Sequence, residues 1–213
     1  ANYLDLGLIK DNVLTILSPK QQVKQYDLVL KEKEDIDKDI ATCIYTGILT
    51  DSGSFRFPGT TGNTHRIIAE LIDLGVENTQ IPVLLFDNSS FSRLQLLGRA
   101  LQNMKIFEEH KTSYMTLTQE ELDSFHYVKG DTEGIVNYGL SIKDIVFTAI
   151  FIENKDEGII KISFRSQGGF DVNQFARDHF NGGGHSNAAG GRSEVSMEET
   201  VNKFEDLVKK LKL

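Results

Sequence analysis

The stretch Asn181–Gly191 reads NGGGHSNAAGG, and the rest of the chain can be interpreted outward from it. Glycine lacks a Cβ and adopts positive φ values readily, so three in a row can turn several backbone N–H groups toward one anion. His185 follows at once, and Arg165 closes an expected strand upstream, which would add a donor side chain and a fixed cation. The alternative is an ordinary glycine-rich turn after a helix. The glycines, histidine and small residues together favour a phosphate-binding loop.

Regular elements are expected on both sides of this loop. Asp171 can cap a helix from Val172 to Phe180, and Ser196 with Glu199 forms a capping box for a last helix, Met197 to Leu211. Alternating or apolar runs upstream predict three strands, the last two joined by a hairpin turn at Asn154–Gly158: Ile106 to Leu117, Asp144 to Glu153 and Gly158 to Arg165. The C-terminal half is therefore α/β or α+β.

The N-terminal half shows mainly helical spacing. Apolar residues predict a helix from about Asp37 to Leu49, capped by Asp35 or Asp37, and a second one capped by Thr64 and stopped by Gly75. Val13 to Leu17 is expected to be a strand. A further helix from Phe91 to Met104, with Leu94, Leu97, Leu101 and Met104 on one stripe, would bridge two domains. We predict an α/β protein with domains at 1–87 and 105–213, joined by a helix within 88–104.

The overall composition narrows the class of partner. The chain has 213 residues, a formal net charge of −8 and a pI near 5.2, which argues against binding duplex DNA. A short phosphorylated ligand needs only a locally basic pocket. No apolar run approaches the ~20 residues of a membrane span, so no membrane partner is expected. A single cysteine, Cys43, and a start without signal-peptide features suit a reducing cytoplasm.

Asp51 is the carboxylate that most suggests metal binding. It would stand at the C-terminal end of a helix, where a negative charge is unfavourable by ~0.3 to 1 kcal/mol unless a cation compensates. Without further motifs, a simple turn residue in Thr50–Gly53 is the better interpretation. The histidines have no zinc-type spacing, and the loop Glu133–Asn137 alone indicates only a turn.

The order of four motifs adds a family resemblance. TDSG at 50–53, EGIVN at 133–137, SFRS at 163–166 and GGGH at 182–185 resemble the DHH phosphoesterases, and within them the bacterial nano-RNase type with a C-terminal DHH-associated domain. The similarity extends from about Asp39 to the C-terminus. It implies a catalytic α/β DHH domain with a parallel sheet and a smaller α/β associated domain with a mixed sheet.

The resemblance also implies an activity and its residues. Such enzymes hydrolyse very short oligoribonucleotides from an end and remove a phosphate from adenosine 3′,5′-bisphosphate, using Mn²⁺, with two ions activating water. Asp51 matches a catalytic, metal-ligating aspartate. Five residues match substrate-phosphate positions: Arg165, Gly182, Gly183, Gly184 and His185.

The sequence departs from the family pattern in its first part. The Asp-x-Asp run, the second-motif aspartate and the Asp-His-His triplet are absent, and residues 1 to 50 contain no histidine. The two-metal site cannot be assembled from this chain as written, so the chain alone is expected to be inactive. Either a segment is missing around 19–25, or the protein is a degenerate homologue.

Other function classes remain open from the sequence. A noncatalytic nucleotide or RNA binding module is one, because a similar glycine-rich domain ends alanyl-tRNA synthetases. A single-strand exonuclease of the same superfamily is another, made less attractive by the acidic balance. Short oligonucleotides or a nucleotide bisphosphate are the expected partners. The sequence allows a homodimer and does not decide the oligomeric state.

Overall fold

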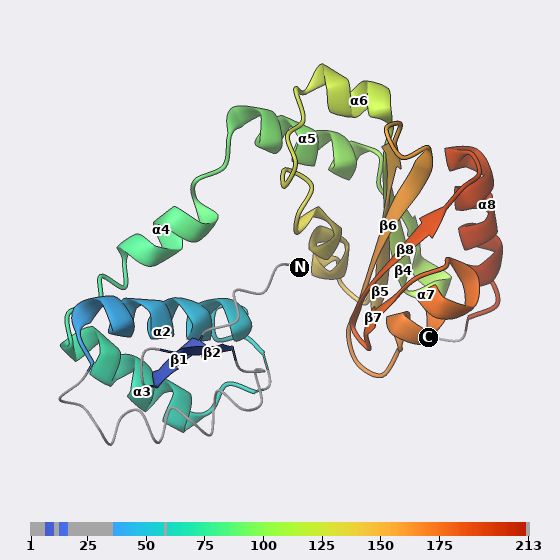
Figure 1. Ribbon diagram of the computed structural model, residues 1–213. Coiled ribbons are helices and arrows are strands. Elements are labelled where there is room, and N and C mark those ends of the chain that lie inside the picture. Colours follow the sequence, from blue (N-terminus) through green and yellow to red (C-terminus); the bar gives the residue numbers. More distant parts are fainter. Residues whose placement is uncertain (1–6, 11–12, 17–35, 58, 212–213) are drawn as a thin grey trace. The chain divides into compact units, whose positions relative to one another are not determined.

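The computed structural model describes residues 7–10, 13–16, 36–57 and 59–211 (Figure 1). The chain divides into two compact units, Ala1–Asn88 and Ser89–Leu213. In this chain the C-terminal unit is therefore the larger one, whereas the resemblance implied a smaller associated domain. No helix in the described ranges is long and apolar enough to cross a membrane.

The C-terminal unit is built on a six-stranded mixed sheet, as expected for its α/β class. Its spatial order is β3 (Lys105–Phe107), β4 (Thr112–Leu117), β5 (Phe147–Asn154), β6 (Ile159–Ser166), β8 (Ala188–Ser193) and β7 (Gly183–His185). Only β4 and β5 pair in parallel. Their crossover carries α6 (Gln119–Ser124) and the 3₁₀ helix η3 (Ile135–Ser141). The expected hairpin between β5 and β6 is confirmed by their antiparallel register.

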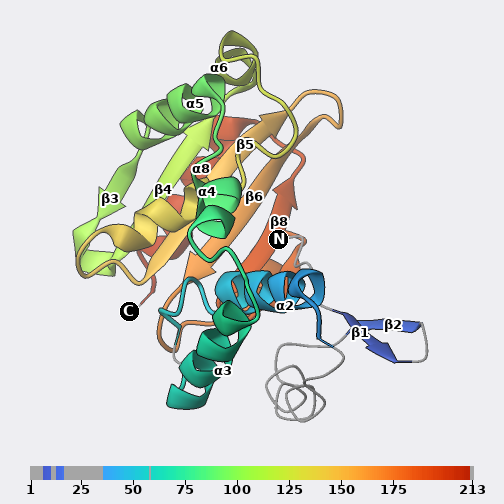
Figure 2. The ribbon, with the colours of Figure 1, turned by 90° about the vertical axis from the view of Figure 1, so that its left-hand side faces the viewer.

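Helices lie on both sides of this sheet (Figures 1 and 2). On one side, α7 (Val172–His179) and α8 (Met197–Val208) cover a core rich in phenylalanine, in which Phe204 is fully buried. Its ring lies 5.6 Å from Phe147 and 5.1 Å from Phe151, centroid to centroid. On the other side, α5 (Phe91–Gln102) packs over β4 and β5. Each fully buried phenylalanine contributes about 1.5–3 kcal/mol to folding.

The described part of the N-terminal unit is mainly helical. α2 (Lys38–Asp51), α3 (Gly62–Asp73) and α4 (Gln80–Phe86) are its helices, and all three contribute to one core that includes Ala41, Ile48, Ile67, Leu71 and Ile81. Strands β1 (Gly7–Lys10) and β2 (Val13–Ile16) pair with each other.

Three expectations need correction. The one described strand pair of the first unit is antiparallel, not parallel, because only two residues separate Lys10 from Val13 and a parallel pair needs a long crossover. Helix α3 is capped by Thr61, which exchanges hydrogen bonds with Thr64 in a capping box. The strand expected from Ile106 to Leu117 is interrupted by a 3₁₀ turn, Glu108–His110, and by Lys111 at φ 44°.

The buried stripe of α5 also differs from expectation. Leu96 and Ala100 are the fully buried residues, whereas Leu94 and Leu101 are exposed. Leu96 and Ala100 belong to the core of the C-terminal unit, together with Met115 and Ile150 of the sheet. The helix expected to bridge two domains is therefore part of the second unit's packing.

Candidate functional site

The glycine stretch forms the edge strand of the C-terminal sheet. Gly183–His185 are β7, which pairs antiparallel with β8. A Cβ on Gly182 would lie 1.9 Å from the Gly190 carbonyl oxygen, and one on Gly184 would lie 2.5 Å from the Ala188 oxygen. Both distances are far below contact distance. Glycine is required here because two backbones approach closely.

The backbone N–H groups of the glycine stretch were expected to converge on an anion. The Gly182 N–H donates to the Ala176 carbonyl at 3.1 Å, and the Gly184 N–H donates to Asn173 Oδ1 at 2.9 Å. Two of the N–H groups assigned to an anion thus have acceptors within the protein. The sequence correctly singled out these glycines. In the structure, glycine is required at Gly182 and Gly184 because the two strands pack closely there.

Arg165 and His185 are brought to one level of the sheet. Arg165 on β6 faces Ala188 on β8, and Ala188 faces His185 on β7. Directly opposed residues share a face, so both side chains project from the same side, with Cα atoms about 10 Å apart across two strand spacings. Arg165 is half-buried and His185 exposed. A phosphate could be reached by both side chains at once.

The residues between them are small. Ala188 separates the two in their row, and the next row on the same face is Ser163, Gly190 and Gly183. This leaves an open floor on which a ligand can approach the backbone. One terminal nitrogen of the Arg165 guanidinium, Nη1, donates to the Phe164 carbonyl at 2.9 Å and so helps to hold the group in place.

The turn that joins β7 to β8 is held firmly. The Asn187 amide donates to Ser166 Oγ at 2.9 Å, and Ser166 Oγ donates to the Phe170 carbonyl at 2.7 Å. The backbone N–H of Val172, at the start of α7, donates to the Ser186 carbonyl at 2.8 Å. Hydrogen bonds with β6 and α7 therefore fix the backbone next to His185.

A second arginine lies at this edge, and the sequence interpretation missed it. Arg177 on α7 donates from Nε to Asn173 Oδ1 at 3.0 Å, the oxygen that also accepts from Gly184. Its Cζ and Nη2 both lie 3.5 Å from the position of a Cβ on Gly183. The only sequence signal for this contact is the i, i+4 spacing of Asn173 and Arg177 on the helix.

Asp51 belongs to the other unit, as the last residue of α2. Three consecutive residues after it have left-handed backbone: Gly53 at φ 57°, Ser54 at 58° and Phe55 at 66°. Such a run is costly for side-chain-bearing residues, at about 1–2 kcal/mol each. The turn is fixed by hydrogen bonds from Ser54 N to the Leu49 carbonyl and from Phe55 N to Ser52 Oγ, 2.8 and 2.9 Å long.

The described residues do not fit a two-ion metal site. Within these ranges no three His, Cys, Asp or Glu side chains gather closely enough to hold a metal ion. Asp51 can supply one ligand at most, and the remaining ligands would have to come from outside the described residues. Nor do the two units, each described by itself, place Asp51 relative to Arg165 and His185.

The Glu133–Asn137 loop has a structural explanation. The Arg93 guanidinium donates to the carbonyls of Gly130, Asp131 and Glu133 at 2.6 to 2.8 Å. Ile135 and Val136 are buried in the core under α5. The turn interpretation is therefore sufficient for this motif.

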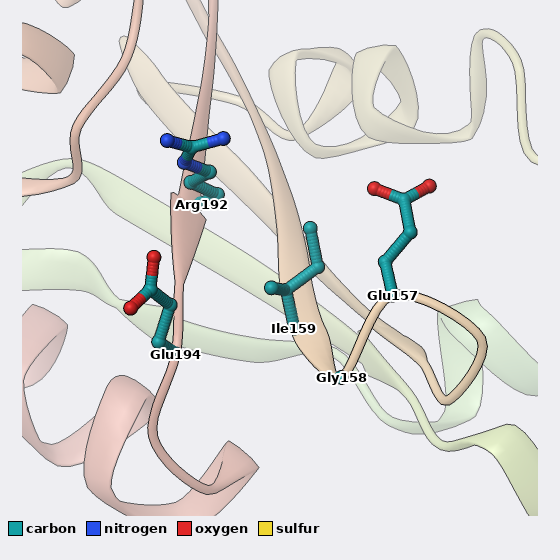
Figure 3. Close-up of a pocket in the computed structure, with 5 residues that line it drawn as sticks. All are labelled: Glu157, Gly158, Ile159, Arg192 and Glu194. Carbon is teal, nitrogen blue, oxygen red and sulfur yellow. The ribbon is translucent and has the colours of Figure 1, made fainter.

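An open depression of about 550 Å³ lies at the hairpin end of β6 and β8 (Figure 3). Its lining residues are Glu157, Gly158, Ile159, Arg192 and Glu194. A hydrogen bond from Lys161 lowers the pKa of Glu157. The depression contains none of the residues expected to bind substrate, and its two carboxylates make it a poor receptor for phosphate.

The fold and the glycine edge strand define the class of this protein. Residues 114–212 match the DHHA1 domain, which covers most of the six-stranded unit. Together with the relatives below, this places the chain in the DHH family, with a DHHA1 domain as its C-terminal unit.

Among curated proteins, the chain is similar to two enzymes named bifunctional oligoribonuclease and PAP phosphatase NrnA. The Bacillus subtilis protein is 30% identical over 185 residues, covering 85% of this chain and 57% of that protein. The Thermus thermophilus protein is 34% identical over 156 residues, covering 71% and 44%. The chain thus spans about half the length of these relatives.

Among solved structures, the chain is similar to an exopolyphosphatase-related protein from Bacteroides fragilis. The two are 38% identical with a TM-score of 0.85, and the match covers 95% of this chain and 61% of that one. This similarity extends over the described parts of both units.

Proposed function

We propose that the intact protein hydrolyses phosphate esters of short oligoribonucleotides and of adenosine 3′,5′-bisphosphate, and that its DHHA1 unit holds the substrate phosphate. The names of the Bacillus and Thermus relatives support the substrate class. The observation that carries the binding role is the cross-strand row Arg165–Ala188–His185 on one face of the sheet.

The binding step follows from the chemistry of this row. Arg165 keeps its charge at all physiological pH values and presents a planar fork of donors suited to phosphate oxygens. His185 adds a donor from the edge strand. Gly190 has no side chain, and a Cβ there would find its nearest neighbour, the Ile162 oxygen, at 3.6 Å, so a phosphate can lie close to the sheet between Arg165 and His185. These residues bind and orient the substrate, and they do not cut it.

For the hydrolytic part we propose a divalent metal, with Mn²⁺ the expected ion and Asp51 as one ligand. A metal of this kind activates water and stabilises charge that develops on phosphoryl oxygens. Since the described residues do not complete the site, no step of the hydrolysis is assigned to them.

The intact protein should release product from a diribonucleotide and from adenosine 3′,5′-bisphosphate when Mn²⁺ is supplied. Arg165→Ala and His185→Ala should each raise KM about tenfold or more, with kcat changed much less, because a charged hydrogen bond contributes about 1.5–3 kcal/mol to binding. Steady-state kinetics on both substrates provides the measurement.

Two controls separate binding from cutting. Asp51→Asn should lower turnover and weaken Mn²⁺ binding in calorimetry, while leaving substrate binding in place. Binding of a short oligonucleotide without any turnover at saturating Mn²⁺ would instead identify a noncatalytic module. Absence of product above a metal-free blank on both substrates would end the proposal of hydrolysis.

A further inference from the structure

A second arginine lies at the sheet edge, beside Gly183. In an extended strand, side chains two residues apart point to the same face, so Gly183 and His185 share a face. The Arg177 guanidinium occupies the side of Gly183 where a Cβ would be, with Cζ, Nη2 and Nε at 3.5 to 3.6 Å from that position. The Arg177 guanidinium therefore lies beside Gly183, in the edge strand that also carries His185.

The position of Arg177 is fixed by Asn173. One oxygen, Asn173 Oδ1, accepts from Arg177 Nε at 3.0 Å and from the Gly184 N–H at 2.9 Å. The Asn173 side chain therefore joins α7 to β7 and also holds Arg177. Fixing Nε in this way removes part of the conformational entropy that a free arginine loses when it binds a ligand.

The two ends of the guanidinium remain available. Among the described residues, Arg177 Nη1 and Nη2 have no hydrogen-bond or ion-pair partner, and the same holds for the His185 ring. Both residues are exposed. A guanidinium held at Nε, with free Nη groups beside the strand that carries a histidine, is suited to receive the oxygens of an anion.

We propose that Arg177 is a phosphate-binding residue of this site and that Asn173 is its positioning residue. The inference rests on the proposed function and deepens it. Two arginines and a histidine around a small-residue floor fit a terminal phosphate, which carries up to two negative charges, better than an internal diester, which carries one. Arg177 thus favours a ligand with a phosphorylated end, such as adenosine 3′,5′-bisphosphate, over the uncharged nucleoside.

The test uses adenosine 3′,5′-bisphosphate as the probe and adenosine as its uncharged counterpart, titrated into the 213-residue chain without metal. Chemical-shift titration by NMR measures dissociation constants as high as the millimolar range, so weak binding is also detected. Arg177→Ala should weaken bisphosphate binding about tenfold or more and leave adenosine binding unchanged. Asn173→Ala should give a smaller loss in the same direction, and little further loss when Arg177 is already alanine.

Arg192→Ala is the matched control. Arg192 is an exposed arginine on the sheet face that carries Arg165 and His185, and it lies opposite Lys161 in the strand register. It is about 13 Å along β8 from the row that contains His185. Arg192→Ala removes the same charge as Arg177→Ala, so a general electrostatic effect would weaken binding equally in these two variants. Arg177→Lys keeps the charge but loses the Nε anchor and the planar fork, and should restore only part of the affinity.

The outcomes are distinct. Wild-type affinity in Arg177→Ala, or equal losses in Arg177→Ala and Arg192→Ala, would overturn the inference and leave the proposed function standing. No binding by the wild-type chain would overturn the inference and the phosphate-binding role together. A selective loss in Arg177→Ala, with unchanged circular dichroism and thermal unfolding, would establish it even if hydrolysis were never observed.

Discussion

At the scale of single residues, the glycines of the site differ in whether a residue with a side chain could replace them. Gly182 and Gly184 lie where any Cβ would meet backbone at 1.9 and 2.5 Å, whereas a Cβ on Gly190 would find its nearest neighbour, the Ile162 oxygen, at 3.6 Å. The first two glycines are thus imposed by backbone contact, and the third is not.

Gly182→Ala should therefore destabilise the C-terminal unit by about 1–3 kcal/mol, because β7 and β8 must separate to admit the methyl group. Gly190→Ala is the matched control on the facing strand and should cost little. Urea unfolding followed by circular dichroism compares the two variants. Similar free energies of unfolding for both would contradict the close-packing explanation.

The sequence led correctly to Arg165 and His185 as residues of one region, since both lie beside the glycine stretch or close an adjacent strand. It could not show Arg177, because the contact with Gly183 depends on how α7 packs against the edge strand. The acceptors of the Gly182 and Gly184 N–H groups could not be predicted either, because tertiary packing decides which acceptor an N–H meets, here Ala176 and Asn173.

At the scale of elements, one partly buried hydrogen bond joins the sheet to the last helix. The Tyr114 hydroxyl on β4 donates to Glu205 Oε1 on α8 at 2.6 Å. Burial, strengthened by the hydrogen bond to Glu205, raises the pKa of Tyr114 well above its ordinary value of 10. The folded protein therefore holds this proton at a pH where an unfolded tyrosine has lost it.

The pH dependence follows from this difference. Below pH 10 both states keep the Tyr114 proton, so its contribution to stability is fully present. Above pH 10 the unfolded state binds fewer protons than the folded state, and stability falls as pH rises toward the folded-state pKa. Tyr114→Phe should lower stability at neutral pH but make this alkaline loss less steep.

Tyr138→Phe is the control, since Tyr138 is 47% exposed. Denaturant unfolding between neutral pH and pH 11 should give parallel curves for Tyr138→Phe and the wild type, and a shallower one for Tyr114→Phe. A slope for Tyr114→Phe equal to that of the wild type would argue against the raised pKa.

Helix starts were the most predictable elements. Asp37, Asp171 and the Ser196–Glu199 pair cap α2, α7 and α8 as expected, because capping depends on a few neighbouring residues. Thr61 rather than Thr64 caps α3, since either threonine satisfies the local pattern. The stripe of α5 was predicted in part: Leu97 and Met104 pack against the core, but the buried centre lies at Leu96 and Ala100, about a quarter turn away.

At the scale of the whole molecule, the described cores are separate. Leu71 belongs to the core of the first unit, and Phe204 to the phenylalanine core of the second, with no residue shared between them. The fold class could be predicted from periodicity and family resemblance. The strand order β3-β4-β5-β6-β8-β7 could not, because pairing of distant strands leaves little trace in one sequence.

Phe204→Ala should destabilise the second unit by about 3–5 kcal/mol and Leu71→Ala the first by about 2–5 kcal/mol, each without loosening the other. Hydrogen exchange read by mass spectrometry resolves this. Faster exchange is expected in peptides from 105–208 for Phe204→Ala, and in peptides from 38–73 for Leu71→Ala. A rise spread over both regions in either variant would show one cooperative unit instead.

The bond from the Gly184 N–H to Asn173 has one more consequence. As a member of the edge strand, Gly184 could offer its outward N–H to a strand from another molecule, and unprotected edges of this kind promote aggregation. The Asn173 side chain already occupies that donor, and β7 is only three residues long. The Gly184 N–H is thereby withheld from pairing with another molecule by an amide from the protein's own helix α7.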